Sequence, residues 1–131
     1  MNKIFNLFHV GRILLLLINY QYLIQFSSYK KLVYRSKANH NEYWFLKILS
    51  QNYGAYILKK VFSILNIKSC LLKSFVSYEF LKKNGFSPAI HIGVDIINDE
   101  FRSHSWIELE NNLVMEHPQN FHSYKTITII K

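Results

Sequence analysis

The sequence of 131 residues contains one cysteine, two prolines and four glycines. A single cysteine cannot form an intrachain disulfide or a cysteine-based zinc cluster, which excludes a disulfide scaffold and a structural zinc finger. So few glycines and prolines exclude a collagen-like chain, and a hydrophobic fraction of 50% excludes a disordered one. We therefore expect one folded chain in a reducing compartment, the cytoplasm.

Motifs for metals and nucleic acids are also missing. The six histidines include no HExxH and no HxxxH spacing, so we expect no metal and no cofactor. The lysines and arginines are scattered among Leu, Ile, Phe and Tyr without a dense basic tract, so we expect no specific nucleic-acid partner.

The charge is divided unevenly along the chain. Residues 1–69 hold ten Lys or Arg and one acid, Glu42, whereas residues 70–131 hold six bases and seven acids. A basic front half can attract an acidic peptide, an anionic membrane surface or nucleic acid. It is also typical of the solvated helix faces of a basic protein, so the charge alone leaves these alternatives open.

Residues 4–26 form the most apolar stretch of the chain. Its uninterrupted core is six residues, 13–18, preceded by Arg12 and followed by Asn19, Gln21 and Gln25. A spanning helix needs about 20 predominantly apolar residues, and the exit lacks the small-x-small pattern of signal cleavage. We expect a buried or interfacial helix, with a membrane span or signal, and hence membrane association through residues 4–26, as the alternative.

Further helices are expected over residues 43–65 and 70–83, before the strand pattern begins. Apolar residues recur at near-helical spacing over residues 43–65, with Gly54 inside, which predicts two helices or one kinked helix. Ser69 is a candidate N-cap for a helix over 70–83, and Asn84-Gly85 is typical of a left-handed helix exit.

Beyond Pro88 the hydrophobic period becomes two. This pattern predicts strands over 89–96, 101–109, 113–116 and 126–130, with turns at 98–100 and 110–112. The layout is α+β: a helical N-terminal half over 1–65, then a helix carrying the cysteine packed on an antiparallel sheet over 66–131, together forming one compact unit.

Three residues fall where a cysteine hydrolase needs them. Cys70 lies in the first turn of a helix, where the dipole and unpaired N–H groups stabilise a thiolate. His104 lies on the second expected strand and Glu116 on the third, so a hairpin can bring their side chains together. These positions predict a nucleophile, a general base and an orienting carboxylate.

Each of these residues also has a plain interpretation. A lone cysteine at a helix start more often packs as a small apolar side chain, and a strand histidine is usually satisfied or exposed. His117, beside Glu116, competes for the role of the base. Trp106 shares a strand face with His104, where it covers the imidazole or lines a peptide cleft, unless it is simply a core aromatic.

At these residues the sequence resembles the lasso-peptide biosynthesis B2 proteins, which are transglutaminase-like cysteine leader peptidases. The resemblance covers residues 66–125, about half of the chain. It rests on the order and spacing of four segments: 70–74 (CLLKS), 81–86 (LKKNGF), 89–94 (AIHIGV) and 101–108 (FRSHSWIE).

This resemblance implies a transglutaminase-like or papain-like core and a cysteine protease that removes the leader peptide from a ribosomally made precursor. The implied partners are the precursor leader, a small leader-binding B1-type protein and an ATP-dependent macrolactam synthetase. Cys70 would be the nucleophile and His104 the general base and acid. The third member is usually Asp in the family, and this sequence has Glu116 in its place.

Other functions fit the same layout. A non-catalytic adaptor on the same fold would use Cys70 only for packing, and a membrane-surface protein would use residues 4–26 as an anchor. Acyl transfer and transglutamination use the same triad geometry as hydrolysis. The basic front half is expected to receive an acidic leader or to dock the leader-binding partner.

Overall fold

The computed structural model describes residues 3–26, 30–31, 33–34, 51–109, 112–114 and 125–131. Its main elements are α1 (Lys3–Phe26), α3 (Gln51–Ile64), α4 (Cys70–Lys83), β1 (Pro88–Ile97), β2 (Glu100–Leu109), β3 (Asn112–Val114) and β4 (Lys125–Ile130). This order confirms the α+β class. Residues 43–50 of the expected second helix and 115–116 of the expected third strand lie outside the described residues.

The caps of α4 are those that the sequence predicts. The side chain of Ser69 accepts a hydrogen bond of 3.2 Å from the Leu72 N–H, which satisfies one donor of the first turn. At the other end Gly85 adopts a φ of 92°, and the N–H of Phe86 donates to the Leu81 carbonyl over 3.1 Å. The Ser69 cap fixes the start of α4, and with it the position of Cys70 at the first residue, while this Schellman closure fixes the end.

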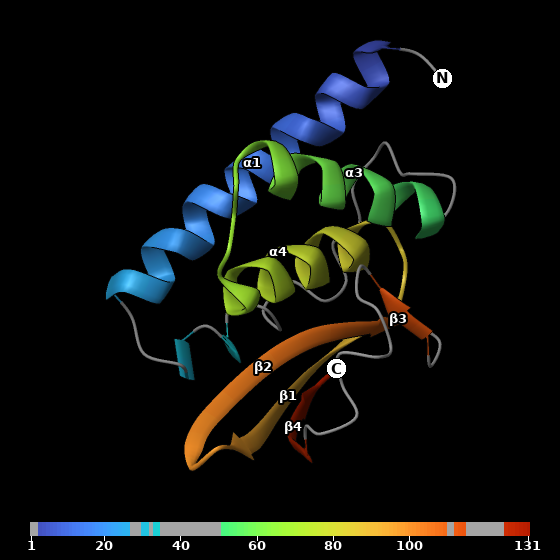
Figure 1. Cartoon of the computed structure of the whole chain (residues 1–131). Helices are drawn as coiled ribbons and strands as arrows, with labels where there is room; N and C mark the ends of the chain where they lie inside the picture. The colour runs from blue at the N-terminus through green and yellow to red at the C-terminus, as the bar shows by residue number, and fades with distance from the viewer. Residues whose placement is uncertain (1–2, 27–29, 32, 35–50, 110–111, 115–124) are drawn as a thin grey trace.

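Helix α4 lies at the centre of three layers (Figure 1). Helices α1 and α3 cover one side of it, and the sheet covers the other. Nine residues of α4 from Leu72 to Leu81 are buried, and Phe75, Tyr78 and Phe80 are fully buried. Buried side chains of all three helices and of the sheet form one hydrophobic cluster, so the position of Cys70 depends on packing from both sides.

Helix α1 is apolar on both faces. Ile13, Leu17 and Tyr20 are buried, and the Tyr20 ring stacks on Phe75 of α4 with centroids 5.6 Å apart. On the other face Leu15 is 64% and Ile18 68% exposed. By length and composition the segment Leu7–Phe26 can cross a membrane, a property shared by signal sequences and by core helices. In this structure one face of α1 belongs to the core.

The sheet has the order β3-β2-β1-β4, and all its pairs are antiparallel. The β1–β2 hairpin turns at Asn98 and Asp99, which both adopt a positive φ, as a two-residue type I′ turn requires. Strand β3 pairs with residues 107–109 only, so residues 100–106 of β2 form the edge of the described sheet. The beginning of α4 lies against this part of β2, which places Cys70 beside the expected His104.

Candidate active site

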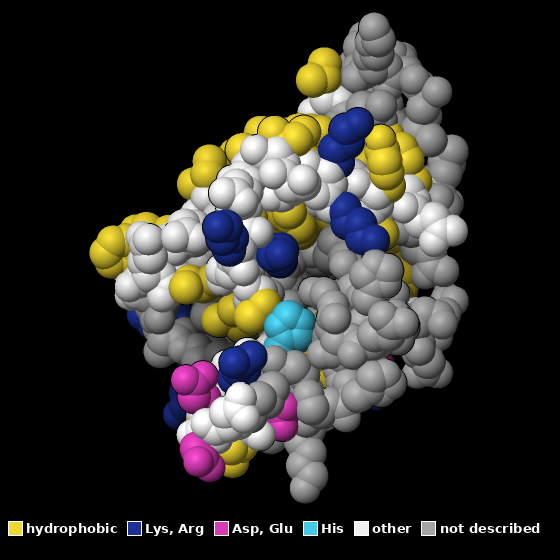
Figure 2. Space-filling model, in the orientation of Figure 1, with side chains coloured by type: hydrophobic (Ala, Val, Ile, Leu, Met, Phe, Trp, Pro, Cys, Tyr) yellow, Lys and Arg dark blue, Asp and Glu magenta, His cyan; other side chains and the backbone are white. Residues whose placement is uncertain are grey.

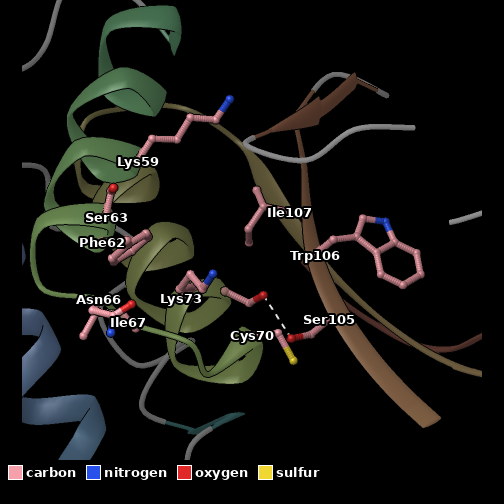
Figure 3. A pocket seen from close by; sticks show the side chains of 11 residues that line it. Lys59, Phe62, Ser63, Asn66, Ile67, Cys70, Lys73, Ser105, Trp106 and Ile107 are labelled. Carbon is pink, nitrogen blue, oxygen red and sulfur yellow. Dashed lines mark hydrogen bonds between the residues drawn. The ribbon is translucent and has the colours of Figure 1, made fainter. Parts of the chain in front are cut away.

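Cys70 is the first residue of α4 and is partly exposed. The first N–H groups of a helix have no acceptor within it, and the positive end of the dipole lies there, so this position favours a negative sulfur. Figure 3 shows the sulfur beside Ser105 of β2. The first turn of α4 and the edge of β2 therefore meet at the thiol.

The thiol of Cys70 is hydrogen-bonded to the side chain of His104. This bond is the main reason why the pKa of Cys70 falls from 9.0 to about 7. Burial opposes it by disfavouring the thiolate, whereas hydrogen bonds to the backbone and side chain of Ser105 lower the pKa further. The tertiary structure thus brings together the two residues that the sequence predicts as nucleophile and base, and the thiol is substantially ionised at neutral pH.

Two serines link the helix and the strand beneath the thiol. The hydroxyl of Ser74 donates a hydrogen bond of 3.1 Å to the Ser105 hydroxyl, and both side chains are buried. Ser74 lies one turn after Cys70 in α4, and Ser105 follows His104 in β2. Because the Ser105 hydroxyl accepts from Ser74, its own proton is available for the sulfur of Cys70.

A row of rings continues from His104 along β2. The His104 imidazole stacks with the Trp106 indole at a centroid distance of 6.1 Å, and His91 of β1 stacks with the same indole at 5.7 Å. Glu108 receives the Trp106 indole N–H at 3.5 Å and pairs with the His91 Nε2 at 2.9 Å. Glu108 therefore helps to orient the indole, and the indole packs against one side of the His104 ring.

A cavity of about 250 Å³ opens beside the thiol (Figure 3). Its walls come from α3, from the loop before α4, from the first turns of α4 and from β2, and its lining residues are Lys59, Phe62, Ser63, Asn66, Ile67, Cys70, Lys73, Ser74, Ser105, Trp106 and Ile107. Trp106 lines the cavity, and in Figure 3 its indole is directed away from the other labelled side chains. In the described part of the chain no three His, Cys, Asp or Glu side chains gather as metal ligands would.

Glu116 and its neighbour His117 lie outside the described residues, so the third member of the predicted triad stays a prediction. The residues that the sequence did not point to are Ser74, Ser105, Lys59, His91 and Glu108. Only Ser105 carried a usable signal, because it stands between His104 and Trp106 and strand alternation turns its side chain toward α4. The others are brought to the site by helix packing and strand register.

The described site is a thiol–imidazole pair in an α+β core, with the thiol at a helix start and the imidazole on an antiparallel strand. The sequence profile of the transglutaminase-like superfamily matches residues 50–128, more than half of the chain. The chain therefore belongs to the transglutaminase-like superfamily, which includes cysteine peptidases. No curated protein and no solved structure matches the sequence.

Proposed function

We propose that this protein is a cysteine peptidase that removes the leader peptide from a lasso-peptide precursor. The observation that supports it most directly is the hydrogen bond between Cys70 and His104, with the Cys70 pKa lowered to about 7. A buried structural cysteine has no such partner, and burial alone would raise its pKa. The segments that resemble the B2 proteins include both residues, which directs the proposal to leader removal.

The proposed reaction has two halves. The thiolate of Cys70 attacks the carbonyl carbon of the bond between leader and core, while His104 holds the thiol proton. The first N–H groups of α4 stabilise the oxyanion of the tetrahedral intermediate. Its collapse breaks the C–N bond as His104 protonates the leaving amine, and a thioester remains on Cys70. Water, deprotonated by His104, then releases the leader carboxylate and restores the thiol.

The remaining elements of the proposal come from the resemblance. Glu116 would orient the His104 ring, and a leader-binding B1-type protein and an ATP-dependent macrolactam synthetase would be the partners. Lys30 and Lys31 are exposed and belong to the basic front half proposed to receive an acidic leader or this partner. The proposed compartment is the cytoplasm, which keeps the single thiol reduced; a carbonate-resistant membrane pellet would contradict it.

The test is cleavage of a precursor by the purified protein and its leader-binding partner, followed by mass spectrometry. We expect Cys70→Ala to abolish cleavage with an unchanged circular dichroism spectrum. Asp99→Asn, an exposed change in the β1–β2 turn outside the cavity, should leave cleavage unaffected. Cleavage by Cys70→Ala would overturn the proposal. Transfer of the acyl group to an added amine, without the free acid as product, would replace hydrolysis by acyl transfer.

Alkylation distinguishes the peptidase from a non-catalytic adaptor. A thiol with a pKa of about 7 reacts readily with iodoacetamide at pH 7, whereas a thiol used only for packing does not. Because Cys70 is the single cysteine of the chain, the mass shift of the whole protein reports this site alone.

A further inference from the structure

Two lysines face the cavity beside Cys70. Lys59 comes from α3 and Lys73 from α4, one turn after the thiol, and both line the cavity (Figure 3). We propose that this cavity binds a carboxylate of the substrate, so that the preferred peptide carries an Asp or Glu side chain next to the bond that is attacked. This proposal rests on the proposed function, because it names the substrate class of the same site.

The lining of the cavity suits such a group. Ser63 and Asn66 also line the cavity and carry hydrogen-bonding side chains, and none of the described lining residues is acidic. Phe62 and Ile107 supply an apolar wall against which a peptide backbone can lie. A carboxylate in this space can therefore meet donors from α3, from the loop before α4 and from α4.

Among the described residues, no carboxylate is paired with either lysine. Within residues 3–26 and 51–69 of the described chain there is no Asp or Glu. Two described carboxylates of the sheet are paired elsewhere, Glu108 with His91 and Glu100 with Arg102. Figure 2 shows several Lys and Arg side chains over the helical part of this face, whereas the visible Asp and Glu side chains lie lower, over the sheet.

The two lysines are distinct from the contacts that shift the pKa of the thiol. The groups that shift the Cys70 pKa are His104 and Ser105, together with burial, and neither lysine is among them. We therefore expect removal of the two charges to change substrate selection more than the ionisation of the thiol.

The experiment compares two alkylating reagents of similar size, neutral iodoacetamide and anionic iodoacetate, by whole-protein mass spectrometry. We expect the ratio of the iodoacetate rate to the iodoacetamide rate to fall roughly threefold to tenfold in Lys59→Gln/Lys73→Gln. Lys60→Gln removes one positive charge next to Lys59 but outside this cavity, and should leave the ratio unchanged. An equal ratio in the wild type and the double variant overturns the carboxylate site.

A second measurement uses peptides. Two synthetic hexapeptides that differ only by Glu or Gln at one central position compete with iodoacetamide for Cys70. We expect the Glu peptide to protect at a several-fold lower concentration, and this advantage to disappear in the double variant and at high salt. Equal protection by both peptides contradicts the proposal. Failure of the proposed function is separate, because it would appear as a thiol that does not react with iodoacetamide at pH 7 in any variant.

Discussion

The imidazole of His104 and the indole of Trp106 are nearly parallel, with an angle of 21° between their planes and 6.1 Å between their centroids. Because Glu108 holds the indole and His91 stacks on it, His104 is supported by a chain of contacts within β1 and β2. The orientation of the imidazole toward Cys70 is therefore partly set by the sheet itself, in addition to any carboxylate that binds its other nitrogen.

This support predicts the effect of removing the indole. Trp106→Ala should loosen the His104 ring, weaken its hydrogen bond to the thiol and raise the Cys70 pKa from about 7 by up to about one unit, since aromatic pairs contribute ~0.5–1.5 kcal/mol. Trp106→Phe retains a ring and should shift the pKa less. The pH dependence of iodoacetamide alkylation measures both, and an unchanged midpoint in Trp106→Ala would show that the stack does not position His104.

Loss of the imidazole should have a larger effect. In His104→Ala the main cause of the lowered pKa is gone while burial still disfavours the thiolate, so the pKa should rise from about 7 toward 9 or above. The thiolate is the form above the pKa, so the alkylation midpoint moves to higher pH and the rate at pH 7 falls by about tenfold or more. A midpoint that stays near 7 would contradict the assigned hydrogen bond.

The Ser74–Ser105 bond predicts two different phenotypes. Each Ser→Ala change should lower the free energy of unfolding by about 1 kcal/mol, and a double-mutant cycle should show coupling of similar size. Only Ser105→Ala should also raise the Cys70 pKa, because only Ser105 bonds the sulfur. Chemical denaturation and the alkylation profile separate these effects; an equal pKa change in Ser74→Ala would mean that the two hydroxyls act as one unit.

Two glycines, one after the end of α4 and one inside α1, give a matched test of the helix backbone. Gly85→Ala places a Cβ at a φ of 92° at the end of α4 and should lower the free energy of unfolding by about 1–2 kcal/mol. Gly11 lies inside α1, where a Cβ would meet no atom within 4 Å. Gly11→Ala should therefore raise the free energy of unfolding by about 0.5–1 kcal/mol. Urea denaturation compares them, and a destabilised Gly11→Ala would argue against the helix at that position.

A second pair of substitutions tests the packing of α1. Ile13→Ala removes a fully buried side chain and should lower the free energy of unfolding by about 2–4 kcal/mol. Ile18 is 68% exposed, so Ile18→Ala should change this free energy by less than about 0.5 kcal/mol. Equal effects of the two changes in urea denaturation would show that α1 does not use this face in the core.

Local features of the sequence were sufficient for the elements that carry the site. Ser69, the Asn84-Gly85 exit and the alternation after Pro88 predict α4, β1 and β2 because capping, left-handed backbone and strand periodicity are properties of neighbouring residues. Helix α1 was predicted as a helix, but its apolar pattern on both faces does not tell which face is buried.

What the sequence by itself determined is therefore the order of helices and strands, the position of a lone thiol at a helix start and the basic character of the first 69 residues. Only the tertiary structure decided that Cys70 meets His104, that Ser74 and Ser105 join beneath them, and that Lys59 shares their cavity. The reason is physical: these contacts join residues far apart in the chain, and their geometry is set by how α3 and β2 pack on α4, which local propensities do not encode.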